Sequence, residues 1–264
     1  MKLLSLNVAM FEDNSEALFD FIQKQNADIL CLQEVTRRLD TQAYPQYVSI
    51  DAIDKASESL RDAFFGPTWV LSFFEKNNFH GKEHFYFDVG GKVEFGNYVK
   101  SRYKILTAKN VFVENDFTYV TDWSNWPHED QRAVEVVDCN VNGKKLRILN
   151  YHGIWSQNKV GNEKTLKACK KIAKLASEVD AAIICGDFNL FPDTESIAVL
   201  NKNFISLVDT FKINTTRPST NELNDKKRNI VDYIFVTEAV TVKNFSVINE
   251  NVSDHLPLVL EFNI

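Results

Sequence analysis

Short apolar runs of strand length recur along the whole chain and predict a protein built mainly on β-sheet. Each run has the length of a strand and is shorter than a typical helix. No linker, repeat or low-complexity tract separates them, so we expect one domain over residues 1–264. The runs are Leu3 to Val8, Ile29 to Leu32, Thr68 to Phe74, Ile105 to Val113, Ala133 to Val137, Leu146 to Tyr151, Ala181 to Cys185, Ile230 to Val236 and Leu256 to Phe262.

Two segments show the spacing of amphipathic helices. Asp13 stands three residues before Glu16, as in a capping box, and apolar residues follow at helical spacing. The segment Asn162 to Glu178 has an apolar face and a face rich in lysine, which we interpret as a solvated surface. Two less regular stretches, Asn77 to Gly96 and Glu114 to Asp130, are expected to form loops at the rim of a site.

The amino-acid composition indicates a globular protein but does not indicate a particular function. Hydrophobic residues at 44% and charged residues at 25% are typical of a globular protein. The net charge of −6 excludes a general attraction to nucleic acid or anionic membranes, so any phosphate-bearing partner must be held by a local site. Four cysteines without a C-x-x-C pair, and no apolar stretch of roughly 20 residues, predict buried thiols in a cytoplasmic protein that has no membrane span. No obligate protein partner is indicated.

Polar residues fall repeatedly at the ends of the apolar runs. If these strands are neighbours, their ends converge on one cleft. A single glutamate after a strand is usually an exposed loop residue, but Asp232 lies inside an apolar run, where an unpaired carboxylate would cost several kcal/mol. It needs a partner, and His255 is the candidate. The polar positions are Asn7, Gln33-Glu34, Asn150-Tyr151-His152, Gly186-Asp187-Phe188-Asn189, Asp232 and Ser253-Asp254-His255.

This set of side chains is suited to a phosphoryl site that contains one divalent cation. Mg²⁺ prefers hard oxygen ligands and keeps several waters, so one or two carboxylates and an amide suffice. Glu34 is the expected main ligand, supported by Asn7 and by Asp254. Mn²⁺ is expected to substitute for Mg²⁺.

The remaining polar residues suggest catalytic roles. Asp187 and Asn189, two residues apart in an extended turn, would face the same side and grip one water. Asp187 would orient or deprotonate that water. His255, backed by Asp232, would donate to a phosphoryl oxygen, and His152 would do the same from a neighbouring strand end.

These motifs, taken in order, resemble the endonuclease/exonuclease/phosphatase family. The resemblance implies an α+β protein with the deoxyribonuclease I-like fold, a four-layer α/β/β/α sandwich of two mostly antiparallel sheets, and Mg²⁺-dependent phosphoester hydrolysis. It also implies metal binding by Glu34, phosphate contact by His152, Asn189 and His255, and activation of the nucleophile by Asp187 or by the Asp232/His255 pair. The matching segments are Ser5-Leu6-Asn7, Leu32-Gln33-Glu34-Val35, Gly96-Asn97, Ser101-Arg102-Tyr103, Asn150-Tyr151-His152, Gly186-Asp187-Phe188-Asn189, Asp232-Tyr233-Ile234-Phe235 and Ser253-Asp254-His255-Leu256-Pro257-Leu258.

Residues that would contact the substrate are suggested less strongly. Arg132 is similar to an arginine that many members place near the phosphate, and a guanidinium can bind two phosphoryl oxygens. A surface ion pair is the alternative for it. Trp155 and Lys159 follow His152 closely and are expected to line the cleft, and Asn150 is expected to contact the substrate. Thr215-Thr216-Arg217 is expected there too, in the polar stretch Asn214 to Asn229, which could equally be a solvated loop.

Two departures from the family pattern affect the choice of substrate. Exonuclease III-like members usually carry an acidic residue where this chain has Ala9, and a tyrosine where it has His152. Both departures weaken the interpretation as a DNA-repair enzyme.

Taken together, the motifs predict a Mg²⁺-dependent phosphodiesterase or nuclease. The alternatives are a phosphomonoesterase acting on a small metabolite or lipid head group, and a catalytically inactive binding protein.

Overall fold

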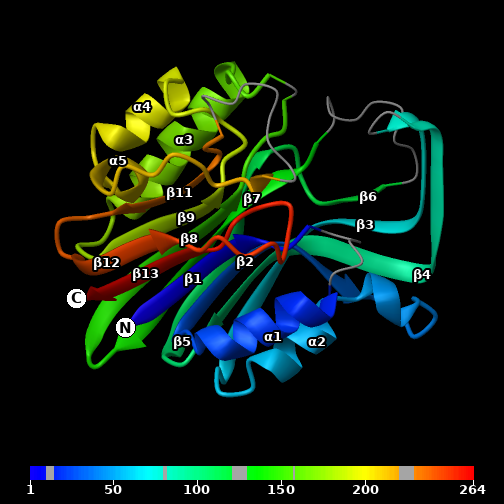
Figure 1. The fold of residues 1–264 in the computed structure, drawn as a ribbon, viewed down its shortest axis with the longest axis horizontal. Helices are drawn as coiled ribbons and strands as arrows, with labels where there is room; N and C mark the ends of the chain where they lie inside the picture. Colours follow the sequence, from blue (N-terminus) through cyan, green and yellow to red (C-terminus); the bar gives the residue numbers. More distant parts are fainter. Residues whose placement is uncertain (10–14, 80–81, 121–129, 157, 220–228) are drawn as a thin grey trace.

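Two β-sheets pack face to face, and each is covered on its outer side by helices (Figure 1). The computed structural model describes residues 1–9, 15–79, 82–120, 130–156, 158–219 and 229–264, with the side chains of 15 and 73–87 excluded. The strands are β1 (Lys2–Asn7), β2 (Ile29–Arg38), β3 (Asp62–Phe79), β4 (Lys82–Ser101), β5 (Lys104–Glu114), β6 (Thr118–Val120), β7 (Arg132–Val141), β8 (Lys144–His152), β9 (Ala182–Asp187), β10 (Ile205–Ser206), β11 (Asp232–Val236), β12 (Thr241–Val247) and β13 (Leu258–Asn263). The helices are α1 (Ser15–Gln25), a 3-10 turn (Pro45–Tyr47), α2 (Ile50–Ala56), α3 (Glu163–Ala176), α4 (Glu195–Asn201) and α5 (Leu207–Thr210).

Strand pairing explains why polar strand ends can meet at one place. Among the described residues, one sheet has the order β12-β13-β1-β2-β4-β3-β6 and the other the order β10-β11-β9-β8-β7-β5. Most neighbours are antiparallel, but three described pairs run parallel: β1 with β2, β8 with β9, and β3 with β6. Parallel neighbours end at the same edge of a sheet, so β1 with β2, and β8 with β9, deliver their C-terminal residues side by side.

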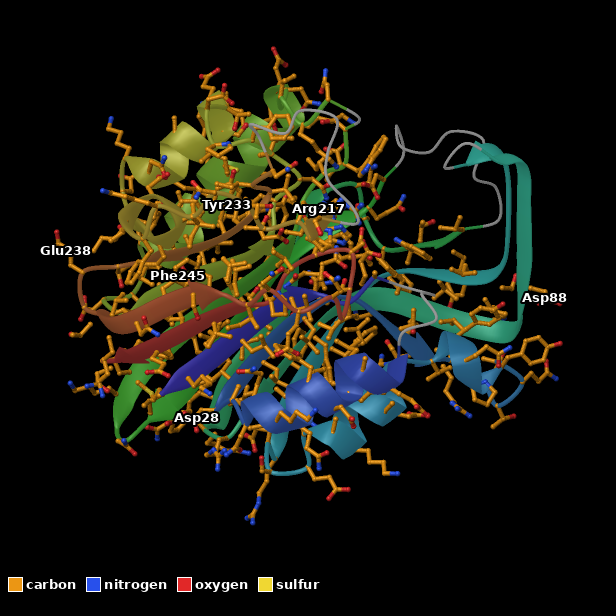
Figure 2. All side chains as sticks on the ribbon, in the orientation of Figure 1. Asp28, Asp88, Arg217, Tyr233, Glu238 and Phe245 are labelled. Atoms are coloured by element: carbon orange, nitrogen blue, oxygen red, sulfur yellow. The ribbon has the colours of Figure 1, made fainter. Side chains whose placement is uncertain are left out.

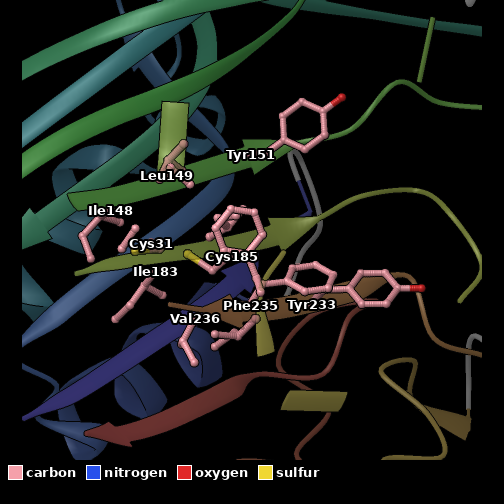
Figure 3. Packing of buried hydrophobic residues seen from close by; sticks show 14 of the residues in the cluster. Cys31, Ile148, Leu149, Tyr151, Ile183, Cys185, Tyr233, Phe235 and Val236 are labelled. Carbon is pink, nitrogen blue, oxygen red and sulfur yellow. The ribbon is translucent and has the colours of Figure 1, made fainter. Parts of the chain in front are cut away.

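The apolar residues form two cores, as a layered sandwich requires. Successive side chains of a strand point to opposite faces, so Leu3 of β1 enters the core between the sheets while Leu4 enters the core under α1 and α2. Figure 3 shows Cys185 of β9 and Phe235 of β11 in the first of these cores. All four cysteines are buried free thiols. The fold class predicted from sequence is confirmed.

Particular elements agree or disagree with the expected boundaries. Helix α3 begins after Asn162, whose side chain accepts from the backbone N–H groups of Lys164 and Thr165. The rim loop expected at Asn77 to Gly96 is wrong, because these residues belong to the long strands β3 and β4, apart from residues 80–81 between them. The capping box at Asp13 lies outside the described residues. None of the described helices combines the length and the apolar character needed to span a membrane.

Candidate active site

Polar residues from both sheets meet at one edge of the sandwich. Asn7 ends β1, His152 ends β8 and Asp187 ends β9. In the ladders, Asp187 pairs with His152 in parallel and with Asp232 in antiparallel register. The strand ends therefore converge as the sequence pattern predicted.

Glu34 leaves the ladder of β2 at a β-bulge. The register between β2 and β4 shifts between Leu32 and Val35, and Glu34 has a φ of +58°. A positive φ is uncommon outside glycine and persists where surrounding structure enforces it. The bulge turns the carboxylate toward β1, where Glu34 Oε1 accepts from Asn7 Nδ2 at 2.9 Å. Its side chain is 25% exposed, so it remains reachable from solvent.

Two glycines allow the ends of β8 and β9 to approach each other closely. A Cβ at Gly186 would lie 2.0 Å from the carbonyl oxygen of Tyr151, and one at Gly153 would lie 2.1 Å from that of Phe188. The backbone N–H of Gly153 also donates to the carbonyl of Asp187 at 2.6 Å. Any side chain at either glycine would force apart the two strands that carry His152 and Asp187.

The carboxylate of Asp187 is the centre of the cluster. Four side-chain nitrogens surround its Oδ2: Asn7 Nδ2 at 3.2 Å, Asn189 Nδ2 at 3.2 Å, His255 Nε2 at 3.5 Å and His152 Nε2 at 3.8 Å. Its Oδ1 accepts from the backbone N–H of Asn189 at 2.8 Å. The expectation that Asp187 and Asn189 face the same side therefore holds, although the two side chains touch directly.

Electrostatics keep Asp187 ionised. Burial acts to raise the pKa of this carboxyl, but the fields of His255 and then His152 oppose it and lower the pKa to about 2. A group with such a pKa is a carboxylate throughout the physiological range.

His255 is charged because of its partner Asp232. Nδ1 of His255 lies 2.8 Å and 3.0 Å from the two carboxylate oxygens of Asp232. Burial lowers the pKa of the imidazole, but Asp232 outweighs this effect and raises it to about 9. Burial also raises the pKa of Asp232, which His255 opposes. Both shifts concern one shared proton, and the short contacts place it on Nδ1, so His255 near neutral pH is an imidazolium with its Nε2–H directed at Asp187.

His152 is neutral, although it is buried almost as deeply as His255. Burial lowers its pKa well below 6.5, and the guanidinium of Arg132 lowers it further. Arg132 Nη1 lies 3.4 Å from Nδ1 of His152. A guanidinium can only donate, so Nδ1 is the acceptor and the ring proton is on Nε2. Arg132 is in turn paired with the buried Asp130 at 2.8 Å.

The other expected contacts of the substrate and metal lie around this centre. Arg217 donates from Nη1 to the carbonyl oxygen and to Oδ2 of Asp254, at 3.0 Å and 3.1 Å. Figure 2 labels Arg217 beside the segment that precedes β13. Trp155 is half-buried, and its ring lies 5.0 Å from Nζ of Lys159. Residues 220–228 of the polar stretch Asn214 to Asn229 lie outside the described part of the chain, as do residues 121–129 of the second expected rim loop.

Asn150 lies beneath the site, and the expected contact with phosphate is corrected. It is fully buried, its Oδ1 accepts from Gln33 Nε2 at 2.6 Å, and its Nδ2 donates to Glu135 Oε2 at 2.7 Å. Glu135 Oε1 accepts from the backbone N–H of Gly66 at 2.8 Å. With both ends of its amide occupied, Asn150 joins the two sheets and cannot reach a ligand.

Two further residues support the site, and sequence reasoning missed the first of them, Glu135, entirely. Glu135 lies inside the apolar run of β7, which is the same signal that revealed Asp232. Thr216, expected to line the cleft as part of Thr215-Thr216-Arg217, holds the backbone instead: its Oγ1 accepts from the backbone N–H groups of Val231 and Asp232 at 3.1 Å and 3.3 Å. It fixes the start of β11, where Asp232 must meet His255.

The described residues offer two sets of ligands for a divalent cation. The first set is Glu34, whose side chain is 25% exposed, with the buried Asn7 beside it, and burial together with the charge of Asp254 raises the pKa of Glu34. A cation would relieve this crowding of carboxylates. The second set comprises Asp187, Asp232 and His255, whose ligand atoms lie within 4.8 Å of one another. In this second set, Asp232 and His255 already share a proton, so the first set is better suited to hard-cation binding.

Comparisons with known proteins agree with this geometry. A profile of the Endonuclease/Exonuclease/phosphatase family matches residues 4–255. The chain belongs to this family. The members in the comparison include nucleases and phosphatases, and a search of curated proteins finds no match.

Solved structures share the fold at low sequence identity. An endonuclease/exonuclease/phosphatase from Bacteroides vulgatus is 16% identical with a TM-score of 0.70, over 100% of this chain and 98% of that one. The mannosyl-6-phosphatase Bt3783 of Bacteroides thetaiotaomicron is 15% identical with a TM-score of 0.65, over 100% of each chain. D. rerio TDP2 complexed with a single-strand DNA product is 16% identical with a TM-score of 0.65, over 100% of this chain and 99% of that one.

Proposed function

We propose that this chain is a divalent-cation-dependent phosphoester hydrolase. The observation that carries the proposal is the ring of four side-chain nitrogens around one buried, ionised carboxylate oxygen of Asp187, with Glu34 at its border. The alternative of an inactive binding protein explains this arrangement poorly, because burying charged groups is costly and clusters of titratable groups with perturbed pKa values are concentrated at functional sites. We also propose that residues 1–264 act as one catalytic domain, and the buried free thiols support a reducing, cytoplasmic setting.

Mg²⁺, or Mn²⁺ in its place, fits the first ligand set. Glu34 would supply a carboxylate oxygen and Asn7 its amide oxygen, with Asp254 adding negative charge nearby. The cation would polarise the phosphoryl group and neutralise developing charge. For Asn7 to bind the cation through its amide oxygen, the amide must turn. At present Nδ2 faces Glu34, and Oδ1 accepts from the backbone N–H of Ala9.

The side chains around Asp187 would each take a different part in hydrolysis. Asp187 is ionised and would accept a hydrogen bond from the attacking water and orient it toward phosphorus. His255 is a charged donor and would stabilise a phosphoryl oxygen as negative charge develops. His152 would donate from Nε2 as a neutral group, and Asn189 would donate from its amide nitrogen. Because His255 already carries its proton, Asp187 is the better candidate for the base.

A phosphodiester, including a nucleic-acid strand, is our first candidate for the substrate. The fold shared with TDP2, which was solved with single-strand DNA product, supports this choice. A small phosphomonoester is the second candidate. It is favoured by the buried cations Arg132 and Lys159 around a compact site in a chain of net charge −6, since a dianion needs more counter-charge than a diester. The fold of the mannosyl-6-phosphatase Bt3783 agrees with this alternative.

A chelation experiment on purified protein tests the function and the substrate class together. Hydrolysis of bis(4-nitrophenyl) phosphate should stop with EDTA and return with Mg²⁺ or Mn²⁺, and 4-nitrophenyl phosphate should be cleaved more slowly. Glu34→Gln should raise the Mg²⁺ concentration needed for half-maximal rate. Activity that persists in EDTA would overturn the cation requirement. A strong preference for the monoester would replace the first candidate substrate by the second.

A further inference from the structure

Lys159 brings an ammonium group into the site from a loop instead of a strand end. It lies between β8 and α3 with a φ of +53°. Its backbone N–H donates to the carbonyl of Ser156 at 3.3 Å, and its carbonyl accepts from the N–H of Phe191 at 2.9 Å. The residue is only 5% exposed. The loop is thus tied to the turn after β9, in a backbone conformation that non-glycine residues rarely adopt.

The contact made by Nζ of Lys159 fixes the orientation of an amide. Nζ donates to Oδ1 of Asn189. An ammonium has no acceptor, so the amide oxygen must face it and the amide nitrogen must face the other way. That nitrogen donates to Asp187 Oδ2 at 3.2 Å and to the carbonyl of Gly153 at 3.4 Å. A reversed amide would turn its N–H groups to the ammonium and its oxygen to the carboxylate, which is unfavourable at both ends.

A purely structural role explains this lysine poorly. Burying an ammonium is costly, and an unbranched apolar side chain would fill the same space without that cost. Burial lowers the pKa of Lys159 to about 8, although the charge of Asp187 acts in the opposite direction. The cation is held where it faces the amide of Asn189 and the ring of Trp155.

Building on the proposed hydrolase function, we propose that Lys159 is a positioning residue that holds the Asn189 amide with its nitrogen toward Asp187. In this orientation the two N–H groups of the amide hold the Asp187 carboxylate and the Gly153 carbonyl, so Asn189 keeps in place the carboxylate that would orient the water. A reversed amide would turn its oxygen to that carboxylate and displace it. Lys159 acts through Asn189 and does not itself have to touch the substrate.

A double-mutant cycle tests this role. Lys159→Met should lower kcat about 10- to 100-fold and change KM less than about threefold, as expected for a misplaced catalytic group. Asn189→Ala should lower kcat at least as much. The double variant should equal Asn189→Ala, because a positioning residue has no effect once the group it positions is absent. Lys159→Arg should recover part of the lost rate, and Lys170→Met, on the exposed face of α3, should match the wild type. Losses that multiply in the double variant would overturn the proposal.

A second measurement does not depend on activity. In ¹⁵N-labelled protein, the side-chain NH₂ signals of Asn189 should shift and exchange faster in Lys159→Met than in the wild type, while melting temperatures show that both are folded. Unchanged signals would overturn the role of Lys159. A wild-type protein that cleaves no phosphoester would instead overturn the proposed function. The NMR comparison would still show whether Lys159 orients the Asn189 amide.

Discussion

His152 and His255 present the same atom to the same carboxylate, yet they differ in charge. Each is at most 5% exposed, and each directs Nε2 at Asp187 Oδ2, at 3.8 Å and 3.5 Å. Burial lowers the pKa of both rings. The group at Nδ1 then decides: Arg132 leaves His152 neutral, and Asp232 keeps His255 protonated.

The difference shows how one fold obtains two kinds of donor from one residue type. A charged donor is most effective where negative charge grows during the reaction. A neutral donor can hydrogen-bond to an anion without forming an ion pair with Asp187. The neighbours of each ring, and not its exposure, therefore set its role. Substitutions at Asp187, Asp232 and Arg132 each disturb a different part of this arrangement.

Replacing the shared carboxylate should have the largest effect. Asp187→Asn removes the charge that both rings face, and we expect kcat to fall about 1,000-fold, the order associated with loss of a general base. Steady-state kinetics with unchanged melting temperature would support this. Asp180→Asn, an exposed carboxylate before β9, is the matched control and should keep full activity. A loss below about tenfold would mean that water is not activated at Asp187.

Removing the charge behind His255 should have the next largest effect, and it should depend on pH. In the wild type His255 stays protonated until the pH approaches about 9. Asp232→Asn removes the main cause of the raised pKa, so the ring should lose its proton at a much lower pH. We expect kcat to fall about 100-fold at pH 8, with the deficit shrinking as the pH is lowered.

NMR titration of the His255 ring in the same variant checks the cause. The wild-type signal should titrate near pH 9 and that of Asp232→Asn below the ordinary value of about 6.5 for histidine. If both proteins titrate alike, Asp232 does not control the proton and the comparison between the two histidines fails.

Much of this arrangement could be predicted from sequence because it follows the strands. Polar residues at the ends of apolar runs indicated the convergence of strand ends, and Asp232 inside such a run required a partner. The ligands expected in Glu34 and Asn7 lie together for the same reason.

What depends on contacts between distant segments could not be predicted. The neutrality of His152 comes from burial, reinforced by Arg132 of the neighbouring strand β7. Asn150 was expected at the phosphate because nothing in the sequence shows that Gln33 and Glu135 occupy its amide. The orientation of Asn189 depends on Lys159, which enters on a loop in a left-handed backbone conformation that no sequence pattern specifies.

Removing the cation beside His152 should have the smallest effect and is the most direct test of the comparison. Arg132→Met takes away the nearby positive charge that lowers the pKa of His152, so that pKa should rise, although burial keeps it below that of an exposed histidine. We expect kcat to fall only about tenfold, since the Nε2–H donor survives. Arg102→Met, at a partly exposed surface ion pair, is the control. The NMR titration of His152 should move to higher pH while that of His255 stays in place. A shift of both rings would show that the two histidines titrate as one coupled unit, and not as separate groups governed by their own neighbours.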